Sequence, residues 1–243
     1  MKKTLLVIMT MVCAWFSLQA ADYKSYKWAQ ICSGVMGDSW YASAEAISVA
    51  DTVLAVQKTN GGWMKNDELH MLSSSELAAL KAARGEHSCL DNYATTQEMR
   101  FLARVYQGTK DERYRTAFVK ALKMILAAEF KNGGWGQYWP LTDDRWSYQN
   151  YITFNDDLTI NALKMMRDVY EAKGIFANMI DEETRQKCVE TFDRGVNMII
   201  RCQIDDNGTK ANMIPWTSSL PKVVPTNCLL SADMSHRPSS LSS

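Results

Sequence analysis

The chain has 243 residues, 47% of them hydrophobic, and its 27 basic and 27 acidic side chains give a formal net charge of zero. This length and apolar content suit one domain with a sizeable core. A balanced charge is not typical of a chain that binds nucleic acid or an anionic membrane surface, so we expect neither partner. Any positive potential must then be local to a particular site.

The N-terminal segment predicts export. Two lysines precede an apolar run from Leu5 to Leu18, and two small alanines follow it. A charged start, an apolar segment and a small-residue cleavage zone are typical of a secretory signal peptide. We therefore expect residues 1–20 to be removed and the mature protein to be secreted or periplasmic, with no membrane span. A lipoprotein is not expected, because Val12 precedes Cys13 where such signals carry a small residue.

A long-range repeat organises the rest of the chain. Similar turns carry Asn60, Asn132 and Asn207, which are 72 and 75 residues apart. Each turn closes a stretch with apolar residues at helical spacing, and Asn-Gly after such a stretch is a helix stop. These stretches are residues 46–56, 117–130 and 189–202, and residues 96–106 and 157–170 show the same periodicity. The pattern predicts an all-α toroid of repeated helical hairpins, with the loops gathered into a cleft at one face.

Aromatic side chains are concentrated at and after these turns. Trp63 and Trp135 end the first two turns, and a dense aromatic group continues to Tyr151. Aromatic rings stack on the apolar faces of sugars, and they equally fill the core at the end of a helical hairpin. For a single tryptophan the core interpretation is favoured, whereas the dense group from Trp135 to Tyr151 favours a binding cleft.

Two acidic turns precede predicted helices. Asp91 and Asn92 come before a helix expected to begin near Thr95, and residues 155–157 read Asn-Asp-Asp before another. One interpretation is helix capping, since Thr95 and Glu98 also fit a capping box. Oxygen ligands from two turns also suit a hard cation such as calcium. Paired carboxylates would equally suit the general acid and base of an inverting glycoside hydrolase.

At these residues the chain resembles the family 10 pectate lyases, from about Trp40 to Lys210. The matching segments, in chain order, are residues 40–43 with 45–47, 50–54, 60–66, 90–99, 101–106, 132–138 and 151–157. The chain departs from the family pattern at a few positions. Met64 and Gly136 stand where proline is usual, Tyr93 where glycine is usual, and Thr52 where asparagine is usual.

The resemblance implies an (α/α)₃ barrel, incomplete here at the C-terminus, and cleavage of polygalacturonate by β-elimination with an arginine base. It implies calcium as the cofactor. Asp91 and Asp156 would be ligands of the ion and would hold the substrate carboxylate through it, with Asn92 as their neighbour. It also places Lys65 as a cation facing a substrate carboxylate and Trp135 as a stacking platform. Calcium bound to the substrate carboxylate acidifies the neighbouring C5 proton, which the base then removes.

The resemblance stops after Lys210, and residues 211–243 are rich in serine and proline without helical periodicity. They are either a disordered tail or a segment translated out of frame. From Asn212 on, the last base of each codon joined to the first two bases of the next can encode Gln-His-Asp and later Arg-Ala-Tyr-Glu-Leu-Pro-Ser, as in the family. The single codons of Met213 and Trp216 each force an aspartate in that frame. We therefore expect an out-of-frame tail that lacks the catalytic arginine, and no lyase activity.

These expectations divide the chain into a signal peptide at 1–20, a partial catalytic domain at 21–210 and an out-of-frame tail at 211–243, in a monomer. Two alternatives stay open. The turns also resemble those of terpenoid cyclases, and the same toroid is compatible with a hydrolase. A chain without its base could instead be a non-catalytic, calcium-dependent pectate-binding protein.

Overall fold

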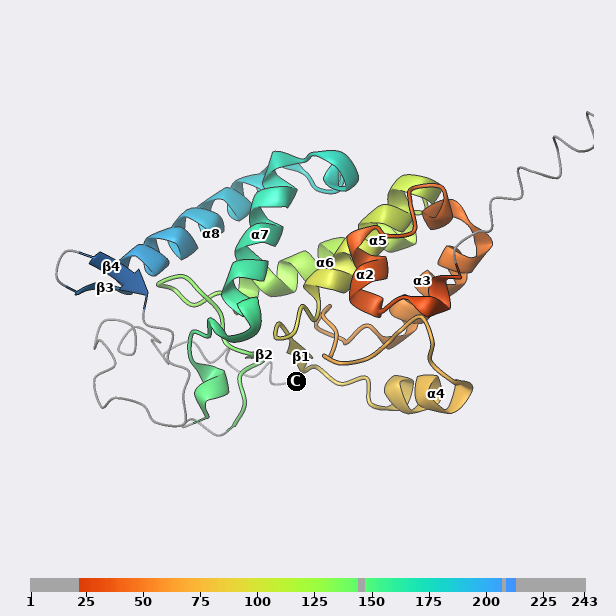
Figure 1. Ribbon diagram of the computed structural model, residues 1–243, viewed down its shortest axis with the longest axis horizontal. Coiled ribbons are helices and arrows are strands. Elements are labelled where there is room, and N and C mark those ends of the chain that lie inside the picture. The colour runs from red at the N-terminus through yellow and green to blue at the C-terminus, as the bar shows by residue number, and fades with distance from the viewer. Residues whose placement is uncertain (1–21, 144–146, 207–208, 213–243) are drawn as a thin grey trace, which may run out of the picture.

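The computed structural model describes residues 22–143, 147–206 and 209–212 (Figure 1). The expected signal peptide and residues 213–243 of the expected tail lie outside the described residues. The α-helices are α2 (Trp28–Ser33), α3 (Ala44–Val56), α4 (Ser74–Ala82), α5 (Thr96–Thr109), α6 (Glu112–Ala128), α7 (Leu158–Glu171) and α8 (Glu182–Arg201). Single 3₁₀ turns are η1 (Tyr23–Ser25), η2 (Trp40–Ala42), η3 (Tyr148–Asn150), η4 (Asn155–Asp157) and η5 (Gly174–Phe176).

The all-α prediction is confirmed, because each of the five stretches with helical periodicity lies largely within a helix, α3, α5, α6, α7 or α8. The strands are short. β1 (Ser88–Cys89) pairs antiparallel with β2 (Tyr138–Trp139), and β3 (Gln203–Asp206) pairs antiparallel with β4 (Thr209–Asn212). The third predicted turn is therefore a β-hairpin after α8, whereas the first two turns leave their helices as loops.

The helices pack as consecutive antiparallel pairs around one core. α5 packs on α6, α7 packs on α8, and α5 also contacts α2, α3 and α7. The apolar residues that recur at helical spacing in α5, Met99, Leu102, Ala103 and Tyr106, are all buried. Burying a large apolar side chain contributes roughly 1.5–3 kcal/mol, so these faces hold the hairpins together.

The first two turns are structural copies of each other. Trp63 Nε1 donates to the Val53 carbonyl and Trp135 Nε1 donates to the Ile125 carbonyl, both at 2.9 Å. In each turn the first glycine has a positive φ and lies against a later helix. A Cβ on Gly61 would lie 2.6 Å from the Lys120 carbonyl oxygen of α6.

The second turn repeats that approach one hairpin further along the chain. Gly133 has φ 91°, and a Cβ there would lie 2.6 Å from the Arg194 carbonyl oxygen of α8. Only glycine tolerates both the left-handed backbone and this distance. The repeat seen in the sequence is therefore a docking unit, which ends one helix and fixes the next hairpin against it.

The helix-capping interpretation of the acidic turns is wrong. α5 begins after Thr95, whose φ is 67° and whose side chain makes no capping hydrogen bond. Thr95 Oγ1 instead donates to the Cys89 carbonyl at 2.9 Å and accepts from Trp63 N at 3.0 Å. Glu98, the other half of the expected capping box, accepts from Trp28 Nε1 in the core at 2.7 Å. Asp157 at the start of α7 makes no capping bond either.

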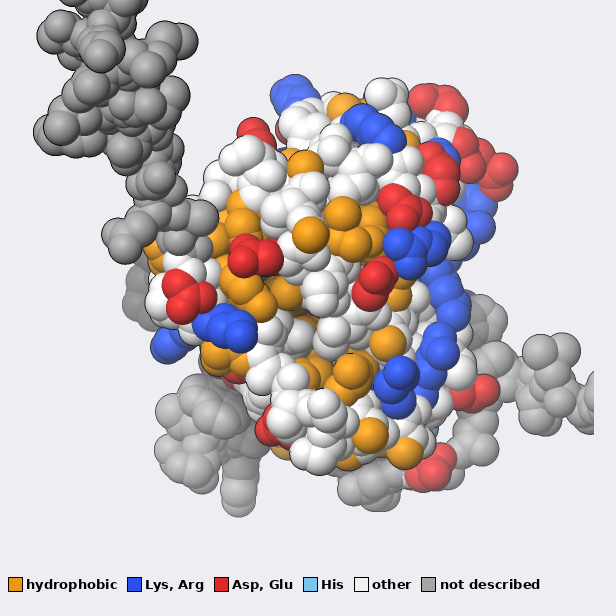
Figure 2. All heavy atoms as spheres, turned by 90° about the vertical axis from the view of Figure 1, so that its right-hand side faces the viewer, with side chains coloured by type: hydrophobic (Ala, Val, Ile, Leu, Met, Phe, Trp, Pro, Cys, Tyr) orange, Lys and Arg blue, Asp and Glu red, His pale blue; other side chains and the backbone are white. Residues whose placement is uncertain are grey.

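The surface of the described residues carries side chains of both charges. Figure 2 shows acidic and basic side chains interspersed with apolar ones on the face that lies at the right of Figure 1. None of the described helices combines the length and apolar character needed to cross a bilayer.

Candidate functional site

The loops that follow the helices are joined by backbone hydrogen bonds into one layer. Cys89 N donates to the Trp63 carbonyl at 2.8 Å, and Leu90 N donates to the Gln137 carbonyl at 3.0 Å. Thr153 N donates to the Trp135 carbonyl at 3.0 Å and ties in the loop before α7. Figure 1 shows the β1–β2 pair below α5, α6 and α7. Residues distant in sequence are thus held side by side.

Asp91 is the centre of a polar cluster in this layer. Its Oδ2 accepts from Lys65 Nζ at 2.5 Å and from Gln137 Nε2 at 2.6 Å. The Asp91 side chain is 4% exposed, and that of Lys65 is 23% exposed. Burial alone would lower the pKa of Lys65, but the hydrogen bond and charge of Asp91 outweigh it and raise that pKa. Lys65 is therefore a stable ammonium at the edge of the cluster.

Two oxygen atoms of the same cluster have no hydrogen-bond partner. Asp91 Oδ1 and Gln137 Oε1 are both buried and unpaired. Buried polar atoms are nearly always paired, and an unpaired one costs about 1–3 kcal/mol. Both atoms are acceptors, so a cation or a hydrogen-bond donor would satisfy them. Oxygen ligands of this kind suit a hard cation such as calcium.

The backbone beside Asp91 is held in a left-handed conformation. Asn92 has φ 51° and Tyr93 has φ 63°, and Asn66 across the loop has φ 71°. Asn92 Nδ2 donates to Asn66 Oδ1 at 3.1 Å. Asparagine adopts this conformation readily, but it strains a tyrosine by about 1–3 kcal/mol. Such strain is typical of segments that the surrounding structure positions for a function.

Asp156 lies on a different loop from this cluster. Its carboxylate is exposed, its φ is 48°, and its Oδ2 accepts from Asn155 Nδ2 at 2.7 Å. Among the residues that the structure describes, no hydrogen bond or ion pair joins Asp156 to Asp91, and no three His, Cys, Asp or Glu side chains are placed to hold a metal ion. The predicted ligands thus occupy two loops of one layer without forming a closed metal cage.

The predicted role of Trp135 is wrong in this structure. Its side chain is 0% exposed, and its indole nitrogen is bonded to the end of α6. A ring enclosed by protein has no face to offer to a sugar. Trp135 fills the end of the hairpin, as Trp63 does, so the core interpretation holds for both residues.

Gln137 is a site residue that was not predicted from the sequence, although the repeat contains the signal that identifies it. Lys65 follows Trp63 by two positions, and Gln137 follows Trp135 by two positions. Because the two turns are structural copies, equivalent positions of both turns reach the same oxygen of Asp91. Asn66, the partner of Asn92, was likewise not singled out.

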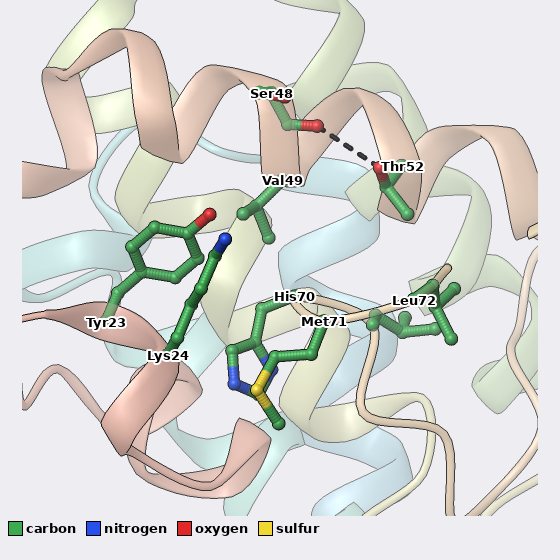
Figure 3. Close-up of a pocket in the computed structure, with 9 residues that line it drawn as sticks. Tyr23, Lys24, Ser48, Val49, Thr52, His70, Met71 and Leu72 are labelled. Carbon is green, nitrogen blue, oxygen red and sulfur yellow. Dashed lines mark hydrogen bonds between the residues drawn. The ribbon is translucent and has the colours of Figure 1, made fainter. Parts of the chain in front are cut away.

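A separate cavity lies near the N-terminus of the described chain. It has a volume of about 420 Å³ and is lined by Tyr23, Lys24, His70 and hydroxyl-bearing residues of α3 (Figure 3). His70 stacks on Trp28, with ring centroids 5.8 Å apart, and its Nε2 lies 2.9 Å from the Tyr26 carbonyl. None of the predicted site residues lines this cavity.

The fold and the site define an all-α protein of repeated hairpins. Its loop layer carries a polar cluster in which two buried oxygen atoms have no hydrogen-bond partner. Residues 57–218 match the model of the pectic acid lyase family, which covers well over half of the chain, and the chain belongs to this family. No curated protein matches the chain.

Solved structures of family 10 polysaccharide lyase from Cellvibrio cellulosa are similar to the chain. One is 28% identical and has a TM-score of 0.60, with 70% of this chain and 51% of that chain covered. Another, an aspartate-to-alanine mutant in complex with trigalacturonic acid, has the same identity and TM-score, with 67% and 48% covered. The chain therefore spans about half the length of the structures that it matches.

Proposed function

We propose that the chain binds polygalacturonate with calcium in the cleft of a pectate lyase, as a monomer exported from the cell. The observation that carries this proposal is the pair of unsatisfied acceptor oxygens, on Asp91 and Gln137, in a member of the pectic acid lyase family. The trigalacturonic acid bound to the similar Cellvibrio lyase supports the substrate class.

Each candidate residue has a distinct part in this proposal. Asp91 and Asp156 would hold calcium together with a substrate carboxylate, because two protein carboxylates alone do not supply the six to eight oxygens that calcium takes. When bound there, calcium supplies Lewis-acid stabilisation of the charge that develops beside C5. Lys65 contributes a second positive charge toward the substrate, and Asn92 holds the loop through Asn66. Gln137 orients the Asp91 carboxylate.

Cleavage by β-elimination requires a base at C5, for which the family resemblance implies an arginine. In the alternative reading frame this arginine spans the Val223–Val224 junction, outside the described residues. We propose that the chain as written binds polygalacturonate without cleaving it. A version with residues 211–243 restored to the alternative frame and continued in that frame should produce unsaturated oligosaccharides, measured by their absorbance.

The binding proposal is tested by titrating trigalacturonate into the chain with calcium and with a chelator. Asp91→Asn should weaken calcium-dependent binding about tenfold or more, since hydrogen bonds and ligation by a charged group contribute about 1.5–3 kcal/mol. Asp38→Asn removes an exposed carboxylate elsewhere and is the matched control.

The outcomes separate the possible functions. Equal binding with and without calcium, or unchanged binding by Asp91→Asn, would contradict the calcium proposal. Unsaturated product from the chain as written would show that it retains a base. Release of reducing sugar without unsaturated product would instead indicate a hydrolase.

A further inference from the structure

A second cavity borders the strained loop, because Tyr93 of that loop is among its lining residues. It has a volume of about 450 Å³, and its lining includes Cys32 of α2, Arg100 of α5, Asn161 and Lys164 of α7, and Tyr93. Most of its lining residues lie on α2, α5 and α7, and α5 contacts both of the other helices. Tyr93 belongs both to this cavity and to the loop that carries Asp91.

The lining of this cavity carries positive charge and hydrogen-bond donors. It contains no aspartate or glutamate. Lys164 is exposed and forms no ion pair with any described residue, and Arg100 uses Nη2 to bind Asp168 at 2.9 Å. Burial, and then the charge of Glu98, raise the pKa of Cys32 well above its usual range, so its thiol adds no negative charge.

An unsatisfied donor and an exposed ring complete the lining. Asn161 is 7% exposed, and its Nδ2 is buried without a hydrogen-bond partner. A buried amide donor without a partner is costly, so an acceptor brought to it would be stabilising. Tyr93 is 47% exposed, and its ring is available to stack on a sugar face.

The Asp91 cluster and this cavity have opposite chemistry. Around Asp91 the unsatisfied atoms are acceptors, which suit a cation, whereas around Lys164 the free groups are donors and cations, which suit a carboxylate and hydroxyls. Tyr93 lines this cavity and lies two residues from Asp91, so their Cα atoms are within roughly 7.6 Å of each other, at about 3.8 Å per residue. An oligomer of acidic sugars longer than the part held at Asp91 can therefore extend past Tyr93 toward the cavity.

We propose that this cavity is a second uronate subsite, in which Lys164 binds the carboxylate of a sugar further along the same polygalacturonate chain and Tyr93 stacks on its ring. This inference rests on the proposed function, because it extends the same bound polymer. It predicts that affinity rises with oligomer length beyond the trimer.

The test compares trigalacturonate and hexagalacturonate by calorimetry in calcium. Lys164→Ala should weaken hexamer binding roughly threefold to fivefold, because an ion pair formed by an exposed lysine is screened by solvent, and should change trimer binding little. Lys81→Ala removes an exposed lysine of α4 and should bind both oligomers as the unmodified chain does. Tyr93→Gly, which relieves the positive φ, should also reduce the preference for the hexamer.

The results distinguish this inference from the proposed function. If Lys164→Ala keeps the hexamer affinity while Asp91→Asn loses it, the second subsite is overturned and the proposed function stands. Binding of neither oligomer by the unmodified chain would overturn both proposals. Loss of the hexamer preference in Lys164→Ala but not in Lys81→Ala would support the subsite.

Discussion

Glu98 makes the stability of the core dependent on pH, and replacing it with glutamine should remove that dependence. The side chain is fully enclosed, and Trp28 Nε1 and Gln97 Nε2 donate to its Oε1 at 2.7 and 3.0 Å. Its Oε2 has no partner. Burial raises its pKa from 4.5 to about 7, against the smaller opposing effect of the hydrogen bond from Trp28.

The sign and size of the effect follow from this pKa. Between pH 4.5 and about 7 the folded chain keeps a proton on Glu98 that the unfolded chain has lost. The free energy of unfolding therefore falls as pH rises through this window. One pKa unit corresponds to about 1.36 kcal/mol, so the whole contribution is on the order of 3 kcal/mol, present below pH 4.5 and lost by about pH 7.

Glu98→Gln keeps an acceptor for Trp28 and cannot ionise, so its stability should not show this fall. The assay is urea unfolding from pH 4.5 to 8, with the difference between variant and unmodified chain taken at each pH. His70 contributes a slope of opposite sign, because burial lowers its pKa, and the difference cancels it. Glu86→Gln, at an exposed site, is the control. Parallel curves for Glu98→Gln and the unmodified chain would refute the reasoning.

Further predictions concern the second turn. Trp135→Phe should lower the free energy of unfolding by about 1–3 kcal/mol, through the lost bond to Ile125, and leave trigalacturonate affinity unchanged. A loss of affinity in a stably folded variant would restore Trp135 as a sugar contact. Gly133→Ala should destabilise the chain by about 1–3 kcal/mol through its positive φ and its approach to Arg194, as measured by urea unfolding. Gly85→Ala, which meets no atom within 4 Å, should be near neutral; equal effects would contradict the docking role of Gly133.

The helices could be predicted from the sequence because their signals are local. Apolar residues at helical spacing and an Asn-Gly stop predict helices at 46–56 and 117–130. The observed α3 and α6 begin two and five residues earlier and end within two residues of these bounds. The third turn shares the Asn-Gly signal, yet it forms the β3–β4 hairpin. Strands β3 and β4 pair from Gln203 to Asn212, so this segment differs from the first two turns, which leave their helices as loops.

The errors at the site have a common physical cause, which is packing between hairpins. Thr95 and Glu98 have the right spacing for a capping box, but Thr95 is held at a positive φ by bonds to two other loops. Glu98 is drawn into the core by Trp28. Trp135 is enclosed within the packed hairpins like Trp63, whereas the dense aromatic group that begins with it in the sequence favoured a binding cleft.

The arrangement around Asp91 shows how a repeated scaffold produces a site that is not itself symmetric. Two copies of one turn present equivalent side chains, Lys65 and Gln137, to a single carboxylate. One copy supplies a charge and the other a neutral donor with an unsatisfied oxygen. The backbone bonds from Cys89 and Leu90 fix Asp91 between the copies. Substrate binding at Asp91 should therefore depend on how the second turn docks on α8 at Gly133 as well as on the charged residues themselves.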